Sequence, residues 1–443
     1  MYQFKDYKDI SKVFWDIEEK YNLIDYEIDN IKIWQVVRLK IFDILLKELL
    51  HMGDSHVKGS LLLKIKRLPT MIYNSIFYNP YFSKSCDVLV FPHDRVVHFE
   101  GDDIDIYTKF LVDDLLKDGK SIKVLEKPYL CKHHTKKSRF TKYLDFSILY
   151  NFVVKRFINI DLNSEDRFIN IIQNDIKNSF NVSFDLKGIF VEAIKDYKAY
   201  YRYYSTIFKK IRPKKIYIVV SYSYPWVVKS AKDLGIEVIE LQHGTFSKYH
   251  LGYSYPSINK NLEYFPNKFY VWSKYWKDLI PFCIDYDDII IYPFRFQEIE
   301  ISKYKYIQKN HNQVIVLSQG PISNMLSKTI LDNFSFFEDK IIKYKLHPGE
   351  IQRYNDYEYL NILSKKKNVE IILKGNLYEL LASCEYQIGV SSTAIYEGLE
   401  FGLKTILVDL PGIEYMENLV KNGMVKMILK PNNDKSYVNK RFL

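Results

Sequence analysis

The sequence predicts an α/β protein in which two doubly wound domains face each other across a cleft, after a helical N-terminal segment. At a prior of about 150 residues per domain, the 443 residues favour two or three domains, and we expect two. Hydrophobic residues make up 47% of the chain, which supplies buried cores and excludes a disordered or collagen-like protein. Short apolar runs alternate with helical patterns, as in parallel sheets. The expected units are residues 1–84, 85–285 and 286–443.

The N-terminal segment has a helical pattern. In residues 31–50, apolar side chains such as Trp34, Val37 and Ile41 recur at three-to-four-residue spacing. Residues 57–84 combine aliphatic and aromatic side chains with five Lys or Arg and no acidic residue. This mixture suits an anionic lipid surface, but a helix that covers the core with its lysines in water also explains it. We expect no nucleic-acid partner, because no zinc-finger, RNP-type or helix-turn-helix pattern accompanies the charge.

Two series of strands and helices follow. Apolar runs in the first series predict strands at 86–91, 122–126, 216–220 and 236–242, with helical patterns over 177–211 and 225–235. The second series predicts strands at 314–320, 343–349, 369–375, 386–392 and 404–412, and helices at 323–334, 377–384 and 393–401. Ligands of open α/β sheets gather at the carboxyl ends of such strands.

The cysteines and the N-terminus bear on the compartment. The four Cys form no CxxC pair, so neither a zinc site nor a disulfide framework is expected. The first residues lack the features of a secretory signal, and no apolar run reaches the length of about 18 residues that spans a bilayer. We expect a cytoplasmic protein, and residues 57–84 leave open a peripheral position on the inner face of the cell membrane.

The segment His243-Gly244-Thr245 follows the strand predicted at 236–242. A His in this position can present its imidazole to the cleft, where the ring acts as a base or as a hydrogen-bond donor to a phosphate. Alternatively, the ring caps the loop by a hydrogen bond to the backbone. The next residues suit sugar recognition, although an ordinary packed loop also explains them. They are Lys248, His250 and Tyr253.

The segment Lys345-Leu346-His347-Pro348-Gly349 ends another predicted strand. Pro348 keeps His347 extended, and Gly349 lets a ligand approach closely. A His beside Lys345 at a strand end fits a phosphate.

The segment Ser391-Ser392-Thr393 opens the helix predicted at 393–401. Hydroxyls and backbone N–H groups at a helix N-terminus form a phosphate site, or the serines only cap the helix. Glu397, one turn along, is placed to reach ribose hydroxyls. Gly320 lies in a small polar loop. This loop either approaches the donor substrate or forms an ordinary strand–helix turn.

Acidic residues gather after the strand predicted at 86–91. A general base would be sought among carboxylates at a strand end, although a solvated loop also explains them. The cluster comprises His93, Arg95, His98, Glu100, Asp102, Asp103 and Asp105, and its candidate bases are Glu100, Asp103 and Asp105. No HExxH, GxSxG or Walker A motif occurs, which argues against metalloprotease, hydrolase and P-loop functions.

The order of His347-Pro348 and Ser391-Ser392-Thr393 resembles the HP and SS/ST motifs of bacterial GT-B glycosyltransferases. These are the sialyltransferases, polysialyltransferases and Kdo transferases that use CMP-activated nonulosonic acids in capsule and lipopolysaccharide synthesis. The stretch 389–412 is also similar to the nucleotide-binding end of GT-B transferases in general.

The resemblance implies two Rossmann-like domains and a transfer that needs no metal or other cofactor. The partners would be a nucleotide sugar, with CMP-linked donors favoured, and a lipid-linked or glycan acceptor. His347 and the segment Ser391-Ser392-Thr393 would bind the donor phosphate, and Glu397 the ribose. An acid of the first domain would deprotonate the acceptor. The D/E-D/E-G motif of polysialyltransferases is not matched, because the chain reads Glu100-Gly101-Asp102-Asp103.

Three alternatives remain open. The CDP-glycerol glycerophosphotransferases have an HGT motif like His243-Gly244-Thr245, but they tend to carry an aspartate where this chain has Gly389-Val390. A transferase of UDP- or GDP-hexoses would share the GT-B motifs. A non-catalytic scaffold of a capsule assembly complex would keep the fold without the site.

Overall fold

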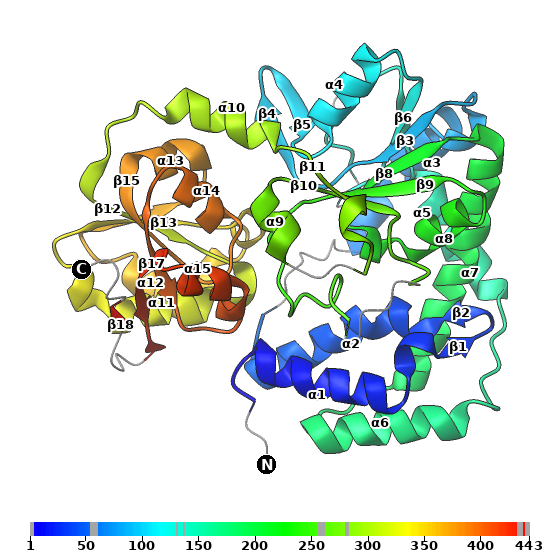
Figure 1. The fold of residues 1–443 in the computed structure, drawn as a ribbon, viewed down its shortest axis with the longest axis horizontal. Helices are drawn as coiled ribbons and strands as arrows, with labels where there is room; N and C mark the ends of the chain where they lie inside the picture. Colours follow the sequence, from blue (N-terminus) through cyan, green and yellow to red (C-terminus); the bar gives the residue numbers. More distant parts are fainter. Residues whose placement is uncertain are drawn as a thin grey trace.

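The computed structural model describes residues 4–53, 61–129, 132–135, 138–255, 262–279, 283–431 and 437–438. Two seven-stranded sheets form two separate α/β units, and a layer of helices adjoins the first of them (Figure 1). The fold class expected from the sequence is therefore confirmed: two Rossmann-like units follow a helical segment.

The first sheet is parallel throughout, in the order β11-β10-β9-β8-β3-β6-β7. Its strands are β3 (Val88–Phe91), β6 (Ile122–Glu126), β7 (Thr141–Tyr143), β8 (Lys215–Val219), β9 (Glu237–Leu241), β10 (Lys268–Val271) and β11 (Ile289–Ile291). A separate hairpin, β4 (Val96–Phe99) and β5 (Asp102–Asp105), follows β3. Because β11 pairs with β10, the first sheet continues beyond residue 285, where the sequence analysis placed the domain boundary.

The second sheet has the order β14-β13-β12-β15-β16-β17-β18, and only β18 is antiparallel to its neighbour. Its strands are β12 (Asn310–Leu317), β13 (Ile341–Lys345), β14 (Val369–Ile372), β15 (Cys384–Gly389), β16 (Lys404–Val408), β17 (Val425–Leu429) and β18 (Tyr437–Val438). Every strand predicted in this part of the sequence is present, and the central strands β12, β15 and β16 each bury a run of at least three residues.

Helices connect the strands. They are α1 (Tyr7–Lys20), α2 (Ile33–Leu50), α3 (Leu61–Phe77), α4 (Lys109–Lys117), α5 (Asp145–Val154), α6 (Asp166–Phe180), α7 (Leu186–Ile211), α8 (Pro225–Lys232), α9 (Lys274–Leu279), α10 (Arg295–Tyr304), α11 (Ser323–Asp332), α12 (Glu358–Leu363), α13 (Leu377–Ser383), α14 (Ala394–Glu400) and α15 (Glu417–Lys421). The stretch 177–211, expected as one helix, is broken. Asn181 adopts a left-handed conformation at the end of α6, and the Asp185 carboxylate caps α7 by accepting from the Gly188 N–H.

A short hairpin, β1 (Glu27–Ile28) and β2 (Ile31–Lys32), joins α1 to α2. Both helices pack with α6 and α7 into an aromatic-rich core below the first sheet in the view of Figure 1. Within this layer Glu18 and Arg38 form a buried two-point ion pair, with both N···O distances at 2.8 Å. Arg38 also donates to the carbonyls of Leu251 and Ser254, in the loop after β9. The helical layer therefore holds the loop that begins at His243.

The N-terminal layer also contacts the second unit. The Tyr7 N–H donates to Glu414 Oε1 at 2.6 Å, and the Gly53 N–H donates to the Pro321 carbonyl at 2.8 Å. None of the described helices is both long and apolar enough to cross a membrane.

The buried Glu18–Arg38 ion pair should contribute to the free energy of unfolding. Glu18→Gln leaves the Arg38 charge buried without its counter-ion, so we expect the free energy of unfolding to fall by about 3 kcal/mol. Urea unfolding followed by circular dichroism measures this loss. Glu19→Gln, on the exposed side of the same helix, is the matched control. A loss for Glu18→Gln of less than about 1 kcal/mol, the value of an exposed ion pair, would contradict the assignment.

Candidate active site

The candidate site lies where loops from the two sheets meet. From the first sheet come the loops after β3 and β9, and from the second come those after β12, β13 and β15. A Cβ at Gly244 would lie 3.5 Å from Thr393 Oγ1, so His243-Gly244-Thr245 is in contact with Ser391-Ser392-Thr393. The structure thus brings together two motifs from opposite units, as expected for the carboxyl ends of parallel strands.

Arg95 extends from the first unit toward the second. Its Nη2 lies 3.9 Å from Glu397 Oε1, and its Nη1 donates to the Tyr107 hydroxyl at 3.0 Å. The Arg95 N–H donates to His93 Nδ1 at 2.9 Å. The Arg95 side chain keeps 38% of its surface exposed, which leaves part of the guanidinium open to a ligand.

Glu397 is the most unusual residue of the site. Its side chain is 2% exposed, and within the described part of the chain neither carboxylate oxygen has a hydrogen-bond partner of good geometry. Burial raises the pKa of Glu397, and the charge of Arg95 acts in the opposite direction. A buried carboxylate that faces one cation and has open acceptor positions beside a cavity can accept hydrogen bonds from a ligand.

Glu397 lines a cavity of about 320 Å³ between the two units. The wall from the first unit contains Trp272 and Phe294, whose rings stack with centroids 4.7 Å apart. The wall from the second unit contains Thr393 and Tyr396 together with Glu397. Aromatic walls with a few convergent polar groups are typical of pockets for organic ligands.

The loop after β13 holds His347 by a reciprocal pair of hydrogen bonds. The His347 N–H donates to Glu350 Oε2 at 2.7 Å, and His347 Nδ1 accepts from the Gly349 N–H at 3.1 Å. Since Nδ1 is an acceptor, the neutral ring carries its proton on Nε2 and can donate it to a ligand. Desolvation, with smaller effects of Arg95 and Lys345, lowers the pKa of His347.

Lys345 and Gly320 flank this loop. Lys345 Nζ donates to the Leu346 carbonyl at 3.1 Å, and desolvation lowers its pKa. A Cβ at Gly320 would lie 3.1 Å from Arg353 Nη2. A side chain at position 320 would therefore require only a small shift of the flexible end of Arg353.

The serines before α14 are engaged within the protein. Gln319 holds Ser391, because its Oε1 accepts from the Ser391 N–H at 3.0 Å and its Nε2 donates to Ser391 Oγ at 3.1 Å. Ser392 Oγ accepts from the Ala394 N–H at 3.2 Å, which is the capping role. α14 has only seven residues, so its dipole alone makes no anion site. Thr393 makes no side-chain cap bond and lines the cavity.

His243 lies beside His93, with ring centroids 5.6 Å apart. Its Nδ1 is buried and has no hydrogen-bond partner in the described part of the chain. Burial, with additional effects of His93, His250 and Arg95, lowers the pKa of His243 well below its usual value. The ring is therefore neutral at physiological pH, and its unpartnered Nδ1 can form a hydrogen bond with a ligand.

The three acidic candidates of the first unit do not line the cavity. Asp105 is 4% exposed and accepts from the N–H groups of His93 and Tyr107 and from the Thr108 hydroxyl at 2.6 Å, so it shapes the loop that carries Arg95. Burial raises its pKa to about 6. Asp103 forms an exposed ion pair with His98 at 3.0 Å, and Glu100 is exposed in the β4–β5 turn. The hairpin turns Asp103 and Glu100 toward solvent, and the loop uses Asp105 internally. That one of the three faces the acceptor stays a prediction.

The three expected acceptor-binding residues are also engaged elsewhere. Tyr253 is 1% exposed and donates to Glu240 at 2.5 Å. Lys248 Nζ lies 3.1 Å from Glu417 of the second unit. His250 Nδ1 accepts from the Gly252 N–H at 3.2 Å, and burial lowers its pKa to about 4. These residues build the loop after β9 and its contact with the second unit. Their role in sugar binding stays a prediction.

Several site residues were not singled out from the sequence. Arg95 was only one member of the charged cluster, and the roles of Tyr107, Gln319, Trp272 and Phe294 were missed. Each of these residues lies within four residues after the end of a strand. That position is the one local feature of the sequence that could have identified them. Among the described residues, no group of three or more His, Cys, Asp or Glu side chains is arranged to hold a metal ion.

Glu240 should make the stability of the protein depend on pH. Its buried carboxylate accepts from the hydroxyls of Ser221 and Tyr253, and burial raises its pKa to about 7, against about 4.3 in an unfolded chain. The folded state binds more protons between these values, so this carboxylate makes the wild type lose stability as the pH rises through that range. Glu240→Gln removes the titration, and its stability relative to wild type should increase from about pH 5 to about pH 8. Thermal unfolding at both pH values tests this, with the exposed Glu370→Gln as control. A relative stability independent of pH would contradict it.

No family model and no curated protein matches this sequence. Among solved structures, UDP-GlcNAc 2-epimerase from Methanocaldococcus jannaschii is similar, with 9% identity, a TM-score of 0.44, and coverage of 79% of this chain and 89% of its own. The enzyme of the same name from Neisseria meningitidis has 14% identity, a TM-score of 0.41, and coverage of 76% and 86%. The glycosyltransferase SnogD from Streptomyces nogalater has 12% identity, a TM-score of 0.39, and coverage of 78% and 87%. Likeness at this level carries no argument about function, which depends on the site itself.

Proposed function

We propose that this protein is a nucleotide-sugar-dependent glycosyltransferase that binds its donor between the two Rossmann-like units. The observation that carries the proposal is the buried carboxylate of Glu397 in the wall of the cavity, which lies 3.9 Å from Arg95 and has no hydrogen-bond partner among the described residues. A ribose supplies hydroxyl donors for that carboxylate, and the neighbouring phosphate supplies a negative charge for Arg95. A nucleotide is the ligand class that carries both groups close together.

The remaining residues then have distinct roles. His347 donates from Nε2 to a phosphate oxygen of the donor, and Arg95 stabilises the charge that develops on the leaving nucleotide. His243, a neutral ring in the loop whose Gly244 contacts Thr393, accepts the proton of the acceptor hydroxyl. The acceptor oxygen forms a bond with the anomeric carbon, the bond from that carbon to the phosphate oxygen breaks, and the nucleotide departs with the electron pair.

The finer identity of donor and acceptor rests on the motif resemblance. We favour a CMP-linked nonulosonic acid as donor, and a lipid-linked or growing glycan of a bacterial surface polysaccharide as acceptor. CDP-glycerol and UDP- or GDP-hexoses are the competing donors. Thermal-shift titration with CMP, CDP, UDP and GDP compounds separates them, because only the bound nucleotide raises the melting temperature.

Glu397 is tested by a substitution of similar size. Glu397→Gln keeps the shape of the side chain but weakens its acceptor strength, and Glu397→Ala removes the group. We expect donor affinity to fall by tenfold or more for the alanine variant, about 1.4 kcal/mol, with a smaller loss for the glutamine variant. Calorimetric titration measures both, and Glu358→Ala on exposed α12 is the control. Wild-type affinity in Glu397→Ala would reject the nucleotide site.

His347 is tested in the same way. His347→Ala should lose at least tenfold in donor affinity, about 1.4 kcal/mol, because a hydrogen bond to a phosphate disappears. His311→Ala is the matched control, since His311 lies on the same sheet with 83% of its side chain exposed. Unchanged affinity in a folded His347→Ala protein would remove His347 from the donor site.

The scaffold alternative is tested by turnover. An enzyme hydrolyses or transfers at least one nucleotide sugar of a panel, and the rate should fall in His243→Ala while donor affinity stays close to wild type. Because we propose a transfer without a metal, EDTA should leave the wild-type rate unchanged. Absence of turnover with every donor, in a protein that still binds nucleotide, would favour the scaffold.

A further inference from the structure

Helix α3 and the turn after it expose large apolar side chains. The exposed fractions range from 42% for Tyr81 to 67% for Phe82. We call this surface the α3 face, and it consists of Ile65, Leu68, Ile72, Tyr73, Ile76, Phe77, Tyr81 and Phe82. Ile65, Leu68, Ile72 and Ile76 recur at helical spacing, so they form one stripe along the helix.

The opposite side of α3 is polar. Asn74 and Ser75 are buried, and Met71 is the one apolar side chain of residues 65–77 that is buried with them. Ser75 Oγ donates to the Met71 carbonyl at 2.7 Å. A surface helix of a globular protein normally turns its apolar stripe inward, so the polarity of α3 is inverted.

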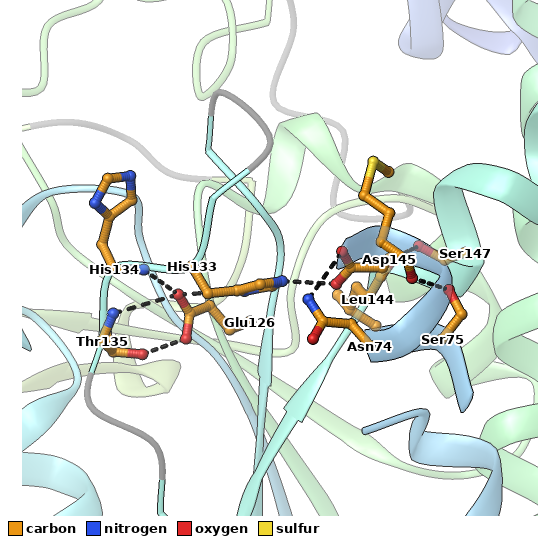
Figure 2. Close-up of polar contacts among 10 residues, drawn as sticks. Asn74, Ser75, Glu126, His133, His134, Thr135, Leu144, Asp145 and Ser147 are labelled. Atoms are coloured by element: carbon orange, nitrogen blue, oxygen red, sulfur yellow. Dashed lines mark hydrogen bonds and ion pairs between the residues drawn. The ribbon is translucent and has the colours of Figure 1, made fainter. Parts of the chain in front are cut away.

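A buried polar network holds α3 in this orientation (Figure 2). Asn74 Nδ2 donates to Asp145 at 3.3 Å, and Asp145 also lies 2.6 Å from His133 Nε2. His133 Nδ1 lies 3.4 Å from Glu126, and the His133 ring stacks on Tyr143. Burial opposes the charged ring, but the hydrogen bonds to Asp145 and Glu126 raise the pKa of His133. Turning the stripe inward would break the hydrogen bond from Asn74 to Asp145.

Cations border the α3 face. Lys66 and Lys84 are exposed, and Lys210 Nζ lies 3.8 Å from the centre of the Tyr81 ring. Residues 57–84 contain no acidic residue, and the whole chain carries a net charge of +10. A second copy of this chain would bring the same cations against each other in a symmetric contact, so self-association is disfavoured. Apolar and aromatic groups rimmed by lysine match the surface of an anionic bilayer.

We propose that the α3 face docks on the surface of a membrane that contains anionic lipids. Its aliphatic and aromatic side chains insert among the headgroups, and the bordering lysines meet the lipid phosphates. Figure 1 labels α3 and α5 on the side of the first sheet away from the second sheet. Docking therefore leaves the cavity between the units open. This inference does not rest on the proposed function, because binding to lipid needs no nucleotide.

Vesicle co-sedimentation tests the proposal with the full-length protein and no nucleotide. The vesicles are pure phosphatidylcholine or phosphatidylcholine with phosphatidylglycerol. Wild type should bind the anionic vesicles at least tenfold more strongly than the neutral ones, and high salt should weaken the binding. The triple variant Ile72→Ser, Ile76→Ser, Phe77→Ser should lose at least tenfold in affinity for anionic vesicles. Lys66→Ala with Lys84→Ala should lose affinity at low salt only.

The control variants distinguish docking through the α3 face from nonspecific adsorption of exposed apolar side chains to vesicles. Tyr306 and Phe336 are 84% and 49% exposed outside the α3 face, so Tyr306→Ser with Phe336→Ser should bind vesicles like wild type. All variants must keep the wild-type melting temperature, which is expected because only exposed side chains change. No binding by wild type, equal binding to neutral vesicles, or wild-type binding by the triple variant would overturn the proposal. A dimer that the triple variant abolishes, without any vesicle binding, would assign the face to a second copy instead.

Discussion

The contact of Arg95 with Glu397 is the interaction on which the candidate site depends. Glu397 is buried without a hydrogen-bond partner among the described residues, and Arg95 is the cation that faces it from the other unit. Arg95 can reach this position only because Asp105 accepts three hydrogen bonds and so shapes the loop that carries it. The pair is 3.9 Å apart and the Arg95 side chain is 38% exposed, so Arg95 is not closed into a tight ion pair and part of its side chain faces solvent. A closed ion pair would stabilise the fold but would bind nothing.

The N-terminal helices position the loops around that contact. Arg38, paired with Glu18, donates hydrogen bonds to carbonyls of the loop after β9. The N-terminal helices therefore hold the backbone that follows His243. The same layer reaches the second unit through Tyr7 and Gly53. The helical segment is thus part of the architecture of the site. Of the N-terminal helices α1, α2 and α3, it is α3 that directs an apolar stripe away from the protein.

Most of the fold could be predicted from the sequence, because buried parallel strands are continuous apolar runs and end at loop-forming residues. Strand β6 was predicted at its observed limits, and the strands of the second sheet that carry the motifs were all found. The interruption between α6 and α7 and the continuation of the first sheet to β11 were not. The left-handed Asn181 and the pairing of a three-residue strand are decided by their surroundings, which a local pattern does not contain.

What the sequence by itself determined is the set of strand ends and the polar residues placed on them. His243 follows a strand of the first sheet, and His347, Thr393 and Glu397 follow strands of the second. Only the tertiary structure decided which of these side chains stay available. It engages Tyr253 with Glu240, Lys248 with Glu417 and Ser391 with Gln319, and it leaves Glu397 unpaired beside a cavity. The physical reason is the separation along the chain of the residues that decide each property. Strand periodicity is a property of neighbouring residues, whereas burial and hydrogen-bond satisfaction depend on residues far apart in the chain.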